Sequence, residues 1–160
     1  MVHNVGIIGL GTVGSRFVEQ FNNHRAFELV AAWDADPEAC SLHAGSVKIC
    51  SGADEVISAS DLVYVAVPPK HHRDYVLSCI AAQTAIFCEK PLGIDLVSSR
   101  ELVDAVERSD LPAGVNFVFS AAPSARELQY KVTNGELGEL TRVDLRLHFS
   151  SWPRAWHEKA

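Results

Sequence analysis

A glycine-rich hexapeptide, Gly9-Leu10-Gly11-Thr12-Val13-Gly14, constrains the fold more than any other part of this sequence. The apolar run over residues 5–8 that precedes it predicts a buried strand. Apolar side chains at helical spacing follow it and predict a helix with one buried face; they are Val13, Phe17, Val18 and Phe21. Asp34 lies 20 residues beyond Gly14, which is typical of a dinucleotide-binding βαβ unit.

The glycines have separate physical roles in such a unit. Gly9 permits a tight turn, Gly11 leaves room for a pyrophosphate, and Gly14 allows the helix to pack closely. The start of the helix offers free N–H groups and a positive dipole end to the phosphates. We therefore expect a cofactor to be bound by Gly9, Gly11, Thr12, Val13, Gly14 and Asp34. For the hexapeptide alone, a glycine-rich surface turn is the alternative.

The composition is that of a water-soluble globular protein. The chain has 160 residues, of which 48% are hydrophobic and 21% charged, enough for one domain and part of another. A net charge of −6 disfavours nucleic acid and anionic membranes as partners. The N-terminus shows no basic segment followed by a long apolar one, so we expect no signal peptide, and no apolar run approaches the ~20 residues of a membrane span. We therefore expect a cytoplasmic protein.

The four cysteines are scattered and show no spacing typical of a metal site; they are Cys40, Cys50, Cys79 and Cys88. They lie in or beside apolar runs, so we expect reduced, buried thiols and no bound metal.

Strand and helix patterns alternate along most of the chain, which predicts an α/β fold of the Rossmann type, a doubly wound parallel sheet. The predicted strands cover residues 5–8, 28–33, 47–49, 62–67, 85–88 and 113–117. The run over 62–67 is continuously apolar, as expected of a central strand. The clearest helix covers 95–109, with Asp95 as its N-cap. Its predicted buried stripe is Leu96, Val97, Leu102, Val103 and Val106.

The pattern changes near Ser120. A helix is predicted from Pro123 to about Asn134, and residues 142–149 alternate between polar and apolar, which predicts a half-exposed strand. We expect residues 1–120 to form a dinucleotide-binding domain. Residues 121–160 would begin a second α+β domain with an antiparallel sheet, used for substrate binding and oligomerisation and incomplete at residue 160.

Two further segments follow predicted strands and so lie where open α/β folds bind ligands. Val67, Pro68 and Pro69 come after the central strand, and His72 begins the next helix. The sequence Glu89-Lys90-Pro91 follows the strand over 85–88. Taken alone, His72 could equally cap a helix or lie on the surface, and the Glu-Lys pair could be a solvated ion pair.

These segments, in this order, resemble the glucose-fructose oxidoreductase, inositol dehydrogenase and rhizopine-catabolism (Gfo/Idh/MocA) family. The matching elements are the glycine loop, Asp34-Ala35-Asp36-Pro37, Ala66-Val67-Pro68 with His72, Glu89-Lys90-Pro91, Asn116, Pro123 and residues 134–140. The Glu-Lys-Pro element is specific in this context, whereas the glycine loop is common to many families.

The resemblance implies an NAD(P)-dependent oxidoreductase that moves hydride between a nicotinamide cofactor and a hydroxyl of a sugar, cyclitol or polyol. Lys90 would be the catalytic residue that helps to move the hydroxyl proton, Glu89 would hold Lys90, and the Lys90–Pro91 bond would be cis. Val67, Pro68, Pro69, His72, Glu89 and Asn116 would contribute to the cofactor site. Family members associate through the second-domain sheet, so we expect a homo-oligomer.

Asp34 favours NAD over NADP, because a carboxylate can accept hydrogen bonds from ribose hydroxyls and repels a 2′-phosphate. The sequence departs from the family at Ser120, where many relatives carry arginine, and it stops before the acid and the histidine of the second domain.

Two other functions remain open. A non-catalytic dinucleotide-binding or sensing module would keep the glycine loop and Asp34. A methyltransferase is disfavoured, because no acidic residue precedes the first glycine of the loop.

Overall fold

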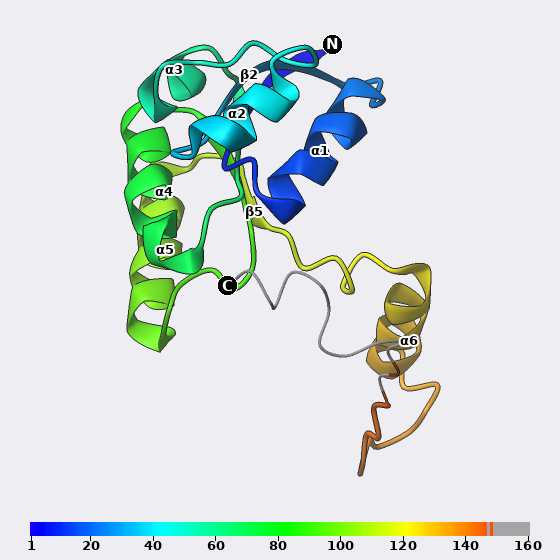
Figure 1. The fold of residues 1–160 in the computed structure, drawn as a ribbon. Coiled ribbons are helices and arrows are strands. Elements are labelled where there is room, and N and C mark those ends of the chain that lie inside the picture. The colour runs from blue at the N-terminus through cyan, green and yellow to red at the C-terminus, as the bar shows by residue number, and fades with distance from the viewer. Residues whose placement is uncertain (147, 149–160) are drawn as a thin grey trace. The chain divides into compact units, whose positions relative to one another are not determined.

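The first 116 residues are built on a parallel sheet of five strands in the order β2-β1-β3-β4-β5 (Figure 1). The computed structural model describes residues 1–146 and 148. The strands are β1 (His3–Ile8), β2 (Phe27–Trp33), β3 (Leu62–Val65), β4 (Ala85–Cys88) and β5 (Ala113–Val115). The predicted Rossmann-type sheet is confirmed, with the strand over residues 62–65 at its centre.

Helices connect the strands and cover both faces of the sheet. They are α1 (Thr12–Asn22), α2 (Pro37–His43), α3 (Ala53–Ser58), the 3-10 turn η1 (Pro69–His71), α4 (His72–Ala81) and α5 (Leu96–Ser109). Figure 1 shows α1 on one side of the sheet and α4 and α5 on the other. This is the doubly wound arrangement, in which ligands bind at the carboxyl edge where the strand order reverses.

The sheet separates two apolar cores. On β3, Val63 and Val65 point into the core beneath α3, α4 and α5, whereas Tyr64 points into the core beneath α1. All three side chains are 0% exposed, as expected for a strand covered on both faces. On α1 the predicted apolar face is confirmed: Val18 and Phe21 are buried, and Val13 and Phe17 pack against them.

The carboxyl ends of β1 and β3 meet where the strand order reverses. The Ala66 N–H donates to the Ile8 carbonyl oxygen over 2.8 Å. Gly9 adopts φ +99°, and a Cβ there would lie 2.7 Å from the Ala66 carbonyl. A Cβ on Gly14 would lie 1.8 Å from the Gly9 carbonyl oxygen. Both positions therefore require glycine, as the turn and close helix packing predict.

The predicted strand over 47–49 is wrong. Only Ile49 forms a bridge, to Ala32 of β2. Two backbone hydrogen bonds hold it: the Ala32 N–H donates to the Lys48 carbonyl, and the Cys50 N–H donates to the Ala32 carbonyl, both over 2.9 Å. Because pairing is limited to this single residue, no ladder develops.

The predicted N-cap of α5 is confirmed, but its buried stripe is largely wrong. The Asp95 carboxylate accepts the Ser98 N–H over 2.7 Å. Leu102 is buried and Val106 is half-buried, whereas Leu96, Val97 and Val103 are exposed. The reason is that α5 packs mainly against α4. An apolar groove of about 230 Å³ remains open between α5 and β5.

The second compact unit is Phe117–Ala160, which follows the first unit, Met1–Asn116. It contains helix α6 (Pro123–Thr133), as predicted. The predicted strand over 142–149 is wrong for residues 142–146 and 148, which have no regular secondary structure; residues 147 and 149 lie outside the described residues. A single strand without a neighbour has no partner for its backbone hydrogen bonds.

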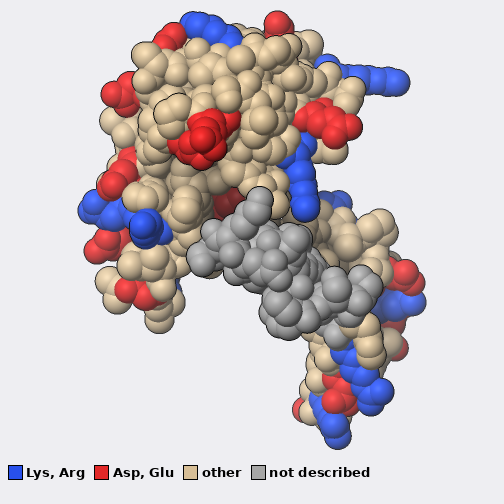
Figure 2. Space-filling model, in the orientation of Figure 1, with Lys and Arg blue, Asp and Glu red and all other residues tan. Residues whose placement is uncertain are grey.

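The surface carries both signs of charge. Figure 2 shows acidic and basic side chains interspersed with uncharged ones on the face that it presents. Within residues 1–146 and 148, no helix has the length and apolar character needed to cross a membrane.

Candidate functional site

The glycine loop leaves an open space at the start of α1. A Cβ built on Gly11 would have no neighbour within 4 Å. The N–H groups of Gly11, Thr12 and Val13 find no acceptor among the described residues. The first turn of α1 contains no acidic side chain. The start of this helix therefore offers free donors and a positive dipole end, which suit an anionic group.

Asp34 is tied directly to the glycine loop. Its Oδ2 accepts the Leu10 N–H over 2.6 Å, and its Oδ1 accepts the Asp36 N–H over 2.8 Å. The side chain is half-buried at the end of β2. Because a carboxylate has about four acceptor positions, Asp34 can accept further hydrogen bonds from a ligand.

A second contact with the loop comes from α2 and was not predicted from the sequence. The Ser15 hydroxyl donates to the Leu10 carbonyl oxygen over 2.6 Å and lies 2.9 Å from Nε2 of His43. These two hydrogen bonds join α1, α2 and the glycine loop.

The aromatic rings of Trp33 and Tyr75 lie beside Asp34 and contact each other edge-on. Burial, followed by the charge of Asp34, raises the pKa of Tyr75.

These features fit the pyrophosphate and one ribose of a dinucleotide. The open position at Gly11 would hold the phosphates, and the free N–H groups would donate to them. The spare acceptor positions of Asp34 would face ribose hydroxyls.

A buried polar cluster lies below the carboxyl ends of β3, β4 and β5. The Tyr64 hydroxyl donates to Oε1 of Glu89. The Asn116 amide also donates to that oxygen, over 2.6 Å, and to the Tyr64 hydroxyl over 3.3 Å. The Lys90 N–H donates to Oε2 of Glu89 over 3.1 Å. Three donors thus converge on one carboxylate that is 6% exposed, which compensates for its removal from water.

Tyr64 is the residue of this cluster that was not predicted from the sequence. It stands within an apolar run, where its ring predicts only burial. A hydroxyl in a strand covered on both faces needs a polar partner. This requirement could have indicated from the sequence that Tyr64 bonds a buried polar group. Burial, followed by the hydrogen bond to Glu89, raises the pKa of Tyr64. The hydroxyl therefore keeps its proton and remains a donor to the carboxylate.

Lys90 lies at the end of β4, and its side chain is exposed. Its Nζ has no hydrogen-bond or ion-pair partner within the part of the chain that the structure describes. The Lys90–Pro91 bond is cis, as predicted. Glu89 contacts Lys90 through the backbone N–H, so the carboxylate fixes the peptide while the amine stays available.

His72 is the first residue of α4 and is 0% exposed. It lies between the Val67–Pro69 segment and residues 89–93, the Lys90 segment, because its ring nitrogens contact the carbonyl oxygens of Val67 and Leu92. Pro68 is exposed, and Val67 and Pro69 are half-buried. The side chains of His72, Glu89 and Asn116 are buried, so they would support a ligand from behind the surface.

The described cysteines are free thiols. Cys50, Cys79 and Cys88 are buried, and Cys40 is half-buried beside Asp34. Burial raises the pKa of Cys79 and of Cys88 to about 12. These two thiols stay protonated near neutral pH and are therefore poor nucleophiles. Within the described residues, no group of three or more His, Cys, Asp or Glu side chains is arranged to hold a metal ion.

Comparison with known proteins places these features in context. Residues 3–117 match the GFO_IDH_MocA family, an oxidoreductase family with an NAD-binding Rossmann fold. The chain is 26% identical over 147 residues to the glucose-6-phosphate 3-dehydrogenase of Bacillus subtilis, covering 91% of this chain and 41% of that protein. It is 29% identical over 143 residues to an inositol 2-dehydrogenase of Corynebacterium glutamicum, covering 85% and 42% respectively.

The fold is shared with a solved structure of scyllo-inositol dehydrogenase from Lactobacillus casei with bound NAD(H) and scyllo-inositol. The TM-score is 0.81 at 22% identity, and the match covers 88% of this chain and 44% of that one. The chain thus spans less than half the length of these relatives.

Proposed function

The chain belongs to the GFO_IDH_MocA family of oxidoreductases with an NAD-binding Rossmann fold, and from this premise we propose that it provides the cofactor-binding half of a dehydrogenase. The substrate would be a sugar, cyclitol or polyol, and its hydroxyl-bearing carbon would be oxidised or, in reverse, its carbonyl reduced. The two curated relatives compared above carry the names of an inositol and a sugar phosphate dehydrogenase.

The placement of Lys90 carries this proposal. Its exposed side chain lies at the carboxyl end of β4, on the same edge of the parallel sheet as the glycine loop. A cofactor-binding module that performs no chemistry would not need an unpaired amine on a firmly held segment. Alternatively, Lys90 could bind a ligand without moving a proton, and the experiment below separates these roles.

The chain's own residues would divide the work as follows. The glycine loop and the start of α1 would hold the pyrophosphate, and Asp34 would hold a ribose. A bound nicotinamide ring supplies the acceptor or donor of hydride. Lys90 would hydrogen-bond the reacting hydroxyl and take its proton during oxidation, returning it during reduction. Glu89 would keep the Lys90 peptide in place.

We also propose that NAD is preferred over NADP. Asp34 lies at the end of β2 with its carboxylate next to the loop, and Asp36 follows two residues later. A 2′-phosphate in this pocket would face negative charge, whereas ribose hydroxyls could donate to Asp34.

The test compares binding with turnover in Lys90→Met, using a form of the protein that oxidises a polyol with NAD. The substitution should lower kcat/KM by about 100-fold or more, since it removes the proton-transfer group. NADH affinity should change by less than about threefold, because one solvent-facing contact is lost. Steady-state kinetics and NADH titration provide the two readouts.

Lys131→Met is the matched control, since the Lys131 side chain on α6 is 43% exposed and its ion pair with Glu127 is at the surface. It should leave both readouts unchanged. If Lys90→Met retained full turnover, Lys90 would not be the proton-transfer residue. If the unaltered protein bound NADH but oxidised no member of a panel of sugars and cyclitols, a sensing module would be favoured.

A further inference from the structure

Buried polar side chains gather behind Lys90. Among the described residues, four polar or charged side chains are buried: His72, Thr84, Glu89 and Asn116. Three of them lie at the segment that contains Lys90, with Glu89 and Asn116 at its start and His72 at its end. A buried polar group is costly unless it is hydrogen-bonded, so this concentration indicates that the segment's position matters.

His72 contacts two segments that are far apart in the sequence. Its Nε2 lies 2.8 Å from the carbonyl oxygen of Val67, just after β3. Its Nδ1 lies 3.1 Å from the carbonyl oxygen of Leu92, two residues beyond Lys90. The ring itself is 0% exposed. Both partners are carbonyl oxygens, which only accept, so a hydrogen bond forms where the facing ring nitrogen carries the proton.

The Lys90 segment is fixed at both ends. At its start, the Lys90 N–H donates to Glu89 over 3.1 Å. At its end, His72 contacts Leu92, and Gly93 is buried against the start of α5. A Cβ on Gly93 would lie 2.5 Å from the Ser98 hydroxyl oxygen and 2.8 Å from the Ser99 nitrogen. Between these anchors, the Lys90 side chain is exposed.

We propose that His72 is a positioning residue that sets the spacing between the Val67–Pro69 segment and the Lys90 segment. The consequence for cofactor binding rests on the proposed function. In a doubly wound fold, β3 and β4 belong to the half of the sheet that receives the second mononucleotide. His72 would therefore control binding of the nicotinamide half and leave binding of the adenosine diphosphate half to the glycine loop and Asp34.

The two ring nitrogens allow the two contacts to be separated by substitution. Asparagine can place an amide near the position of Nδ1, so His72→Asn should keep the contact with Leu92. Glutamine reaches the position of Nε2, so His72→Gln should keep the contact with Val67. His72→Leu removes both contacts. The polar variants leave the buried site with a donor, which protects the test against simple failure to fold.

The first measurement is amide hydrogen exchange in the nucleotide-free chain. The probes are the His71 amide, which donates to the Pro68 carbonyl over 2.9 Å, and the Lys90 amide. Both should exchange about tenfold faster in His72→Leu, because local opening costs less. His72→Asn should accelerate only the His71 amide, and His72→Gln only the Lys90 amide. The Cys50 amide, bonded to Ala32, is the internal control.

The second measurement compares NADH with ADP-ribose, which lacks the nicotinamide. His72→Leu should weaken NADH binding about tenfold, while ADP-ribose binding stays within about twofold. Equal losses for both ligands, or no loss for either, would overturn the positioning role, as would unchanged exchange at both probes. If the unaltered chain bound neither ligand, the proposed function would fail, and the exchange data would still decide whether His72 joins the two segments.

Discussion

At the scale of single residues, the Asp34 carboxylate has one observed task and one proposed task. It accepts the Leu10 N–H over 2.6 Å and the Asp36 N–H over 2.8 Å. These bonds shape the glycine loop and the turn after β2. In the proposed function the same oxygens face the ribose, so cofactor choice and loop geometry depend on one side chain.

Asp34→Asn tests this double role. The amide keeps one oxygen acceptor for the loop but removes the negative charge that would repel a 2′-phosphate. We expect the ratio of NADPH affinity to NADH affinity to rise about tenfold or more, equivalent to about 1.4 kcal/mol. Titrations can follow quenching of Trp33, which adjoins Asp34, and Trp33→Phe identifies the signal that comes from this residue.

Glu38→Gln is the control for general charge, since Glu38 is an exposed acid in the first turn of α2. It removes the same charge a few residues away and should leave the ratio nearly unchanged. An equal rise of the affinity ratio in both variants would show that the general negative charge of the region, and not contact with Asp34, governs cofactor choice.

Residue-level prediction was successful where local spacing carries the information. The glycine positions and the cap at Asp95 follow from short patterns, and the structure confirms them. The contacts of Tyr64 with Glu89 and Asn116 could not be predicted in this way. Tyr64 lies in β3, whereas Glu89 and Asn116 directly follow β4 and β5, so the pairing depends on sheet order and register.

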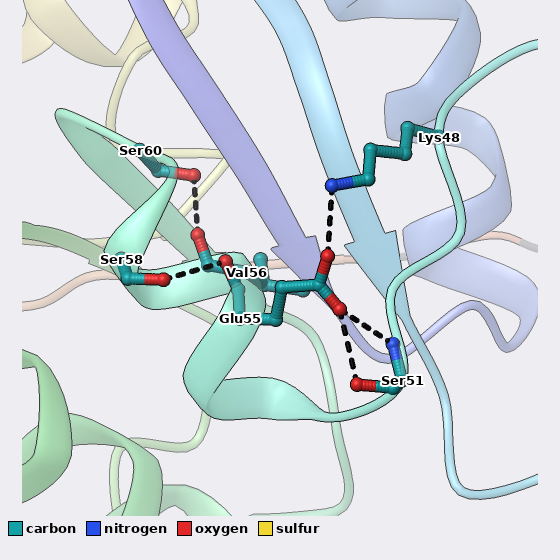
Figure 3. Close-up of polar contacts among 6 residues, drawn as sticks. All are labelled: Lys48, Ser51, Glu55, Val56, Ser58 and Ser60. Atoms are coloured by element: carbon teal, nitrogen blue, oxygen red, sulfur yellow. Dashed lines mark hydrogen bonds and ion pairs between the residues drawn. The ribbon is translucent and has the colours of Figure 1, made fainter.

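At the scale of elements, α3 is a six-residue helix stabilised by contacts with residues that precede it in the sequence. Its N-cap, Gly52, has no side chain to accept a hydrogen bond. Figure 3 shows Glu55 reaching back instead: its carboxylate accepts the Ser51 N–H over 2.9 Å and the Ser51 hydroxyl over 3.0 Å. Lys48 donates to the other oxygen over 2.7 Å. One side chain thus joins the helix to the segment that bridges to β2.

The Glu55 contacts predict a specific loss of stability in acid. The hydrogen bond from Lys48, followed by that from the Ser51 backbone, lowers the pKa of Glu55 from 4.5 to about 2. Because the folded-state pKa is the lower one, the stabilisation is complete above about pH 4.5. It is lost progressively as the pH falls towards 2. Urea unfolding at several pH values should show this decline.

Glu55→Gln should lower stability at neutral pH and flatten the decline between pH 4.5 and 2. Glu28→Gln, at an exposed position of β2, is the matched control and should keep the decline. A decline of equal size in Glu55→Gln and the unaltered chain would assign it to other carboxylates.

Element prediction failed where packing, and not the local pattern, decides the outcome. Residues 47–49 have a strand-like composition, yet only Ile49 pairs with β2. On α5, Leu96 and Val97 have helical spacing suited to burial but remain exposed, because α4 covers a different line of the helix. Neither result could be read from hydrophobic periodicity alone.

At the scale of the whole molecule, apolar side chains are exposed along the second unit. They include Phe117, Phe119, Leu128, Tyr130, Val143 and Leu145, which are between 53% and 79% exposed. The first unit, by contrast, has two buried cores of its own. Apolar surface of this kind favours association with another surface.

We therefore expect the 160-residue chain to self-associate when it is expressed by itself, and residues 1–116 to stay monomeric. Light scattering over a range of concentrations should give a mass above 17.4 kDa for the longer chain. Val143→Asp combined with Leu145→Asp should reduce the association. A monomeric longer chain at all concentrations would contradict the prediction.

Asn116 is the last residue of the first unit, and the chain leaves that unit from the middle of a hydrogen-bonded cluster. Its N–H donates to the Cys88 carbonyl over 2.8 Å, and its amide donates to Glu89, which holds the Lys90 peptide. A pull on the chain beyond residue 116 would thus load the hydrogen bonds of Asn116 first and, through Glu89, the Lys90 peptide. In mechanical terms, the link after Asn116 and the Lys90 peptide are both attached to the Glu89 carboxylate, so a force probe attached beyond residue 116 should report on the segment that contains Lys90.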